Sequence, residues 1–247
     1  DSPLTVGAGS APVTGSGWVN VREIRVHGGS SPLSLSWSDT DSWEVALPLL
    51  PGRHIYTLDA LDFSGNLVGS DSITIDNTSV IPPASDQNLA ITEIHYRPGS
   101  PTIEEEGLGF EARSRFEFVE LMNISSGTID LTNVRFTEGI RFNFTESLTG
   151  IVLAAGERIA IVNDLVAFSH RYPAVPAAAI AGEFTGNLSD AGEALLLVAT
   201  DETMIRSFTY RDLPPWPAAA DGLGPSLVLV HPEGNPDHAD PLNWRSS

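Results

Sequence analysis

The chain has 247 residues, of which 41% are hydrophobic and 18% charged, so it can form one large all-β domain or two ordinary ones. Its 13 basic residues, all Arg, oppose 32 acidic residues and leave a formal net charge of −19. This charge repels phosphate backbones and anionic lipids, which argues against nucleic-acid partners. The absence of Lys and Cys excludes Schiff-base chemistry, disulfides and thiolate metal sites. No apolar run is long enough for membrane insertion, and no signal peptide is visible at Asp1, as expected of a mature or excised fragment.

Residues 1–79 contain short strand patterns separated by turn signals. Trp37 is in phase with Leu35, and Trp43 with Val45, so both tryptophans are predicted to lie in the core. About seven strands emerge, which is the number expected of an immunoglobulin-like β-sandwich. The segments 21–28 and 50–66 resemble bacterial immunoglobulin-like repeats, modules that act as spacers in secreted proteins.

Residues 80–88 are predicted to be a linker, because Pro82 and Pro83 lack N–H donors and stiffen the backbone toward polyproline II. The second domain, 89–247, begins with two apolar strand patterns that carry Glu93 and Glu120. The Gly-rich acidic stretch 98–113 between them is predicted to be an exposed loop. The one clear helix is predicted over 164–172, with Asp164 as its N-cap and Pro173 after its end.

The motifs of 89–247 resemble, in order, those of the lamin tail domain of bacterial secreted proteins. The matching segments are 91–98, 116–123, 129–134, 153–158, 188–197, 216–227 and 243–245. The resemblance implies an immunoglobulin-type sandwich without a catalytic centre, used for docking in nuclear lamins and as an accessory domain of exported enzymes in bacteria. The fold predicted for the whole chain is therefore all-β, with two immunoglobulin-like sandwich domains in tandem. The length of 98–113 and the proline density of 213–217 depart from the family pattern.

Glu93 and Glu120 are the candidate catalytic pair, because two flanking carboxyls perform acid–base catalysis in glycosidases. The spacing does not decide this, because the strand register is unknown from the sequence. The alternative, which we favour, is that the two glutamates form cross-strand ion pairs with Arg97, Arg115 or Arg135. No catalytic residue is therefore assigned, and we expect the chain not to be an enzyme.

Calcium is the metal that the acidic turns would suit, because hard cations bind oxygen ligands. The candidate ligands are Asp39, Asp41, Asp62 and Asn66, with Asp71 and Asp76 as a further pair. The favoured alternative is that these side chains hydrogen-bond to the backbone of their own turns, so no cofactor is assigned. His231 and His238, which lie near Asp237 and Asp240, lack a metal-ligand spacing.

Trp216, held between prolines, is the candidate ligand-binding residue, although packing is the favoured interpretation. The four Asn-x-Ser/Thr sequons, at Asn77, Asn123, Asn143 and Asn187, have meaning only in a glycosylating host. Together these features predict a non-catalytic spacer and attachment module of a larger exported bacterial protein, located outside the cell or on its surface. Its partner would be a protein or a cell-surface polymer, and a catalytic domain would lie upstream. The alternative is a carbohydrate-binding accessory module of a secreted enzyme.

Overall fold

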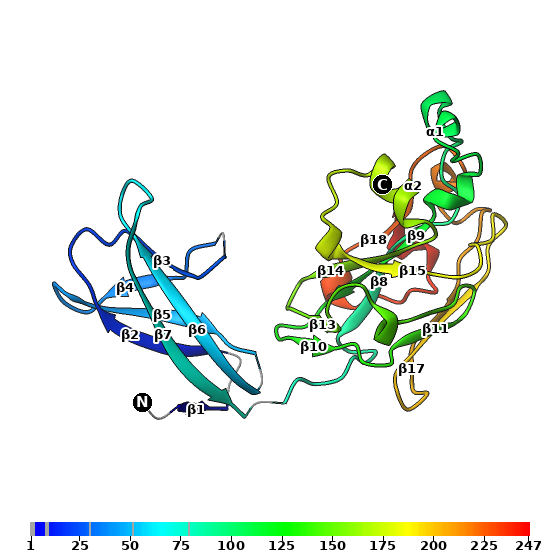
Figure 1. Ribbon diagram of the computed structural model, residues 1–247. Helices are drawn as coiled ribbons and strands as arrows, with labels where there is room; N and C mark the ends of the chain where they lie inside the picture. Colours follow the sequence, from blue (N-terminus) through cyan, green and yellow to red (C-terminus); the bar gives the residue numbers. More distant parts are fainter. Residues whose placement is uncertain (1–2, 8–9, 30, 51, 79) are drawn as a thin grey trace. The chain divides into compact units, whose positions relative to one another are not determined.

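The computed structural model describes residues 3–7, 10–29, 31–50, 52–78 and 80–247, and it is all-β, as the sequence predicts (Figure 1). The chain divides into two compact units, Asp1–Ile81 and Pro82–Ser247. Among the described residues, no helix has both the length and the apolarity needed to cross a membrane.

The first unit consists of two sheets. One has the strand order β1-β7-β6-β3 and the other β2-β5-β4. The strands are β1 (Leu4–Val6), β2 (Ser10–Ser16), β3 (Glu23–Val26), β4 (Leu35–Trp37), β5 (Ser42–Pro48), β6 (Gly52–Leu61) and β7 (Leu67–Asn77).

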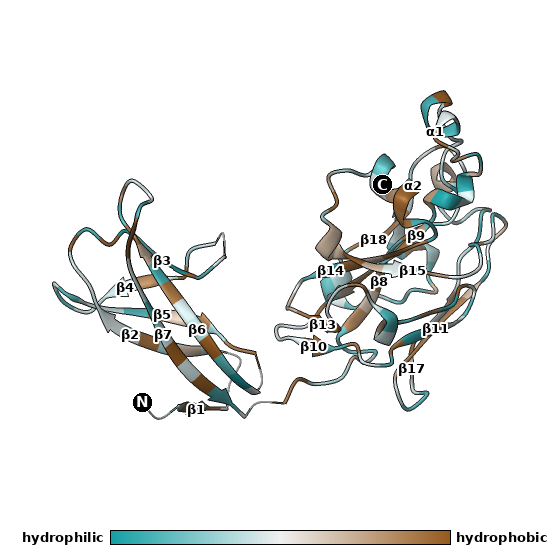
Figure 2. Ribbon diagram, viewed as in Figure 1, coloured by the Kyte–Doolittle hydropathy of each residue, from teal (hydrophilic) through white to brown (hydrophobic). Residues whose placement is uncertain are grey.

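The core of the first unit lies between these sheets, because alternate residues of each strand point to the same face. Apolar and polar residues alternate over 72–76 of β7 (Figure 2), and Leu58 of β6 and Ile75 of β7 are buried. The prediction that Trp37 lies in the core is wrong, since its side chain is 38% exposed. The reason is that β4 is a three-residue edge strand that ends at Trp37.

One side of the first unit carries two incompletely paired edge strands. On its side away from β6, β7 pairs with β1 only over Ile75–Asn77, so the rest of that edge of β7 has no partner strand among the described residues. The strand β2 pairs only with β5 among the described strands. Unpaired sheet edges expose backbone N–H and C=O groups, so this side of the unit is open to solvent or a ligand.

The second unit contains a six-stranded sheet (β15-β14-β9-β8-β18-β19), a four-stranded sheet (β12-β11-β16-β17) and the pair β10-β13. The strands are β8 (Leu89–His95), β9 (Phe118–Asn123), β10 (Ile129–Asp130), β11 (Arg135–Glu138), β12 (Phe142–Asn143), β13 (Val152–Leu153), β14 (Arg158–Val162), β15 (Ile180–Glu183), β16 (Ala194–Val198), β17 (Met204–Thr209), β18 (Leu227–Leu229) and β19 (Trp244–Ser246). The helices are α1 (Ile103–Gly107) and α2 (Leu165–Arg171), with 3-10 turns at Arg113–Phe116, Phe144–Glu146, Ala177–Ala179, Ala218–Ala220, Pro232–Gly234 and Pro241–Asn243.

The two larger sheets of the second unit share one core, which includes Ile91 and Leu121 from one sheet and Phe136 and Leu195 from the other. The opposite face of the six-stranded sheet packs against α2 through Phe168. The predicted N-cap of this helix is confirmed, because the Asp164 carboxylate accepts a hydrogen bond from the Ala167 N–H at 2.9 Å.

The stretch 98–113 is largely exposed, as predicted, but the prediction that it is a loop throughout is wrong. This stretch contains α1, which begins with a capping box between Thr102 and Glu105. The Glu105 carboxylate is buried and binds both Nε and Nη2 of Arg171 on α2, at 2.7 and 2.6 Å. The Arg171 guanidinium also lies over the ring of Phe116 at 3.2 Å. This ion pair therefore fastens the insertion to the second unit.

Most of the stretch predicted as a linker lies on the second unit. Pro83 forms a parallel bridge with Asp130, and the side chain of Ala84 is buried in the core of this unit. The Asp130 N–H donates to the Pro82 carbonyl, and the Ala84 N–H donates to the Asp130 carbonyl, both at 2.9 Å. Residues 82–88 therefore act as an additional edge segment of the second unit.

Candidate functional site

Glu93 and Glu120 are directly opposite each other in the antiparallel pairing of β8 and β9, with a register shift beside them at Thr92. Directly opposite residues of such a pair share a face of the sheet, so the two carboxylates lie side by side. Neither of them lines the two grooves described below. The arrangement therefore brings the predicted pair together without placing it at either groove.

Both carboxylates are engaged by neighbouring side chains. Glu120 forms an ion pair with Arg158 of β14 and accepts a hydrogen bond from the Thr92 hydroxyl at 2.6 Å. Glu93 accepts a hydrogen bond from the buried hydroxyl of Ser226. Burial raises the pKa of Glu93, and the Ser226 hydrogen bond opposes this shift. These contacts hold the two strands to their neighbours.

The arginines that the sequence suggested as partners are paired with other residues. Arg97 binds Asp221 and Asp190, Arg115 binds Asp164, and Arg135 binds Glu202. The expected partners of Glu120 were therefore wrong, because Arg158 reaches it only through the pairing of β9 with β14.

The candidate calcium ligands stabilise their own turns. Asp39 accepts hydrogen bonds from the N–H groups of Asp41 and Ser42 at 3.0 and 2.7 Å, and these bonds lower its pKa to about 2. Asp62 accepts from the backbone and side-chain amides of Asn66, at 2.9 and 3.2 Å, which lowers its pKa. Among the described residues, no group of three or more His, Asp or Glu side chains is placed to hold a metal ion.

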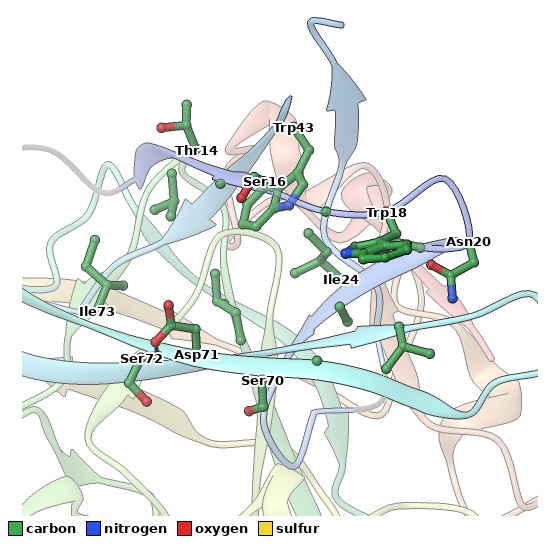
Figure 3. Close-up of a pocket in the computed structure, with 18 residues that line it drawn as sticks. Thr14, Ser16, Trp18, Asn20, Ile24, Trp43, Ser70, Asp71, Ser72 and Ile73 are labelled. Carbon is green, nitrogen blue, oxygen red and sulfur yellow. Dashed lines mark hydrogen bonds between the residues drawn. The ribbon is translucent and has the colours of Figure 1, made fainter. Parts of the chain in front are cut away.

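The tryptophans lie in three different environments, and the expectation that Trp216 is packed is confirmed. Trp216 is 6% exposed and packs against Trp244 with ring centroids 6.0 Å apart, so it is not available to stack on a ligand. Trp18 is 84% exposed, and Trp43 is half-buried. Both line a groove in the first unit (Figure 3).

This groove lies between the two sheets of the first unit and has a volume of about 750 Å³. One wall is formed by β2 and the segment that follows it, and the other by 68–73 of β7 (Figure 3). The buried side chains of Val21, Ile24 and Leu58 form its apolar floor. It lies along the side of the unit where the edges of β2 and β7 are open.

The groove exists because small residues occupy inward-facing positions. Ala60 of β6 is opposite Gly69 of β7, so neither position places a large side chain between the sheets. Two packed sheets lie about 10 Å apart, and that space is normally filled by large apolar side chains. Since Gly and Ala do not fill it, the hollow remains.

Trp43 lies against the backbone of β2. A Cβ atom at Gly15 would overlap with the indole ring, and one at Gly17 would lie 3.2 Å from its Cδ1 and Nε1 atoms. The absence of side chains at the two glycines lets the ring pack directly against β2 in the wall of the groove.

The opposite wall carries a carboxylate. Asp71 lies on the same face of β7 as Ile73 and Ile75, and its register partner on β6 is the buried Leu58. Figure 3 shows its side chain rising from β7 into the groove. Asn20 adds an exposed amide near Trp18. The groove thus combines indole surfaces, which stack on apolar faces of a ligand, with groups that hydrogen-bond to hydroxyls.

A second groove, of about 520 Å³, lies on the second unit and is lined in part by Arg135, Arg141 and Glu183. The Arg135 guanidinium is paired with Glu202, and the Glu183 carboxylate accepts a hydrogen bond from the Leu165 N–H at 2.7 Å. Two of its charged groups are therefore already bound within the protein.

From the sequence, Trp43 was favoured as a core residue and Asp71 was considered only as a calcium ligand, so neither was placed with Trp18 in one groove. The available signal was the Gly-Ser-Gly-Trp run at 15–18, because glycine two residues apart in a strand indicates a close approach on one face. An Asp in phase with Ile73 and Ile75 was a second signal, since it places a carboxylate on the core-facing side of a strand.

No family model matches the chain, and no curated protein matches it. Among solved structures, the chain is similar to SGBP-B of the Bacteroides ovatus mixed-linkage glucan utilization locus, in complex with a mixed-linkage heptasaccharide. The identity is 13%, the match covers 82% of this chain and 38% of that chain, and the TM-score is 0.22. A TM-score this low assigns neither a shared fold nor a shared function.

Proposed function

We propose that the chain is a non-catalytic binding module of an exported protein, and that the groove of the first unit binds a glycan. The observation that carries this proposal is that one groove is lined by the exposed indole of Trp18, by the indole of Trp43, which packs against glycine, and by the carboxylate of Asp71 on the opposite wall. Sugar rings present apolar C–H faces and a rim of hydroxyls, so they match such a surface.

The exposure of Trp18 supports a binding role. Burying a large apolar side chain contributes about 2 kcal/mol, and Trp18 gives up most of this in the free protein because it is 84% exposed. A ligand that stacks on the ring recovers this energy on binding. Trp43 provides a second, half-buried ring that already packs against β2 in the free protein, so it loses less freedom on binding than an unpacked ring would.

The polar groups of the groove suit hydroxyl ligands. A carboxylate accepts hydrogen bonds from hydroxyls, and an amide both accepts and donates them. The carboxylate of Asp71 and the amide of Asn20 both line the groove. The free edges of β2 and β7 add backbone groups along the same side.

The second unit would serve as the attachment module. The motif resemblance of 89–247 to the lamin tail domain supports this role, as does the engagement of Glu93 and Glu120 in hydrogen bonds and an ion pair. The net charge of −19 keeps the module soluble, and the absence of Cys is compatible with a location outside the cell or on its surface. The larger protein would bring a catalytic domain to the polymer that the groove binds.

The test is affinity electrophoresis of the full chain in gels that contain neutral plant and microbial polysaccharides, followed by calorimetry with those that retain it. Trp18→Ala should weaken binding at least about tenfold, because the stacking surface is lost. Phe63→Ala is the matched control, since Phe63 is 75% exposed and lies outside the groove. Retention by none of the polysaccharides, equal losses in the two variants, or turnover of any glycan would contradict the proposal.

A further inference from the structure

The groove contains one carboxylate and no positive charge to balance it. None of the eighteen residues described as lining the groove is Arg, Lys or His, and Asp71 is the acidic one. Asp71 therefore sets the sign of the local charge in the groove, in a chain whose net charge is already −19.

The position of Asp71 directs its charge toward a ligand. Its Oδ1 atom accepts a hydrogen bond from the N–H of Ser72 at 2.7 Å, which fixes the side chain relative to β7. The neighbouring hydroxyls of Ser70 and Ser72 are bonded to Asp59 and Thr57, so they do not bind Asp71. The indole of Trp43 and the side chain of Leu58 line the same groove, and a ligand that lies against them displaces water from around the exposed carboxylate, which strengthens the repulsion between like charges.

We propose that Asp71 makes the groove selective for uncharged glycans, and that it rejects polymers whose sugars carry carboxylate groups. This inference rests on the proposed function of the groove. Repulsion between the Asp71 carboxylate and a carboxylate on the ligand opposes binding, whereas hydroxyls of a neutral sugar donate hydrogen bonds to the same oxygens. Because the groove is open to solvent, added salt will reduce the discrimination.

The experiment compares each neutral polysaccharide of the panel above with its carboxymethylated derivative, for example hydroxyethylcellulose with carboxymethylcellulose, on the full chain at low salt. Wild-type protein should bind the neutral polymer at least about tenfold more tightly, and 0.5 M NaCl should reduce this ratio. In Asp71→Asn, binding of the neutral polymer should weaken, because an amide oxygen accepts weaker hydrogen bonds, while binding of the carboxymethylated polymer should strengthen. A merely structural role of Asp71 would not move the two affinities in opposite directions.

Asp76→Asn is the matched control. It lies on the same strand and makes the same change of charge, but Asp76 pairs with Arg53 and does not line the groove. The ratio of its affinities for the neutral and the carboxymethylated polymer should equal that of the wild type. Equal binding of both polymers by the wild type, or an unchanged ratio in Asp71→Asn, would overturn the inference and leave glycan binding intact. Failure to bind any neutral polymer would instead contradict the proposed function, and the inference with it.

Discussion

Gly15 and Trp43 are register partners in the antiparallel pairing of β2 and β5, and the indole of Trp43 occupies the volume that a side chain at position 15 would need. Directly opposite residues in such a pair have the shortest separation between side chains on a sheet face. The glycine therefore allows the Trp43 ring to pack against β2 in the wall of the groove.

Gly15→Ala should displace the Trp43 ring from β2. The added Cβ overlaps with the ring, so either the indole moves into the groove or the strands separate. We expect a loss of stability of about 1–3 kcal/mol and weaker glycan binding. Thermal unfolding and tryptophan fluorescence measure both effects.

The control for this substitution is Gly69→Ala, because a Cβ there would lie 3.9 Å from the nearest atom, the Cβ of Ala60. It should keep or slightly raise the melting temperature, since Ala in a strand loses less conformational entropy than Gly. A melting temperature of Gly15→Ala as high as that of Gly69→Ala would show that the ring moves aside without cost, which would contradict the prediction.

Arg171→Ala should release the 98–113 insertion from the second unit. The substitution leaves the buried Glu105 carboxylate, whose pKa Arg171 and Thr102 lower to about 2, without its charged partner. Removing one member of a buried ion pair costs about 3 kcal/mol, and the loss should be local because the residues of α1 other than Glu105 are exposed. Hydrogen exchange of peptides from 98–113 should accelerate at least about tenfold.

Glu202→Gln is the control, because it breaks the pair with Arg135, in which the Glu202 side chain is 71% exposed. Such exposed pairs contribute less than about 1 kcal/mol. Unchanged exchange of 98–113 in Arg171→Ala would mean that packing of Phe110 and Phe116, and not the ion pair, holds the insertion.

The stability of the second unit should rise with pH from about 4 to 6.5. Burial lowers the pKa of both His95 and His238 to about 4, so in this range the unfolded chain binds protons that the folded unit does not. Each histidine contributes up to roughly 3 kcal/mol above pH 6.5, and this contribution is lost as the pH falls toward 4. Urea unfolding monitored by hydrogen exchange of peptides from 82–247 measures the slope. A flat profile over this range would contradict the burial of neutral imidazoles.

Glu117 should give the opposite slope at higher pH. Burial raises its pKa to about 8, with Asp190 and Glu193 adding to the shift, so the folded unit keeps a proton that the unfolded chain loses above about pH 4.5. Its contribution to stability is therefore present below pH 4.5 and is lost as the pH rises toward 8. Together with the histidines, this predicts a stability maximum near pH 6.5.

Glu117→Gln should remove the decline above pH 6.5, because a neutral amide keeps the hydrogen bond to the Leu188 N–H without a titrating charge. Stability at pH 8.5 should exceed that of the wild type, measured by the same exchange experiment. Glu106→Gln, at an exposed position on α1, should leave the profile unchanged. If the stability of Glu117→Gln still declines above pH 6.5, groups other than Glu117 cause the decline.

The sequence by itself determined the all-β class, the position of α2 and the absence of Lys and Cys chemistry. Period-two patterns and turn residues report local backbone preference, and an Asp before an apolar run reports a helix start, so Asp164 was identified correctly. The favoured interpretation of Trp216 as a packed residue also agreed with the structure, since its proline-rich setting is local information.

Only the tertiary structure decided what the side chains face. The pairing of β9 with β14 brings Arg158 to Glu120, which lies 38 residues away in the sequence. Likewise, α2 brings Arg171 to Glu105, which lies 66 residues away. The groove likewise depends on two sheets that bring Gly15, Trp43 and Asp71 together from three separate strands. Strand register and sheet packing are set by the summed burial of the whole unit, so no local pattern contains them.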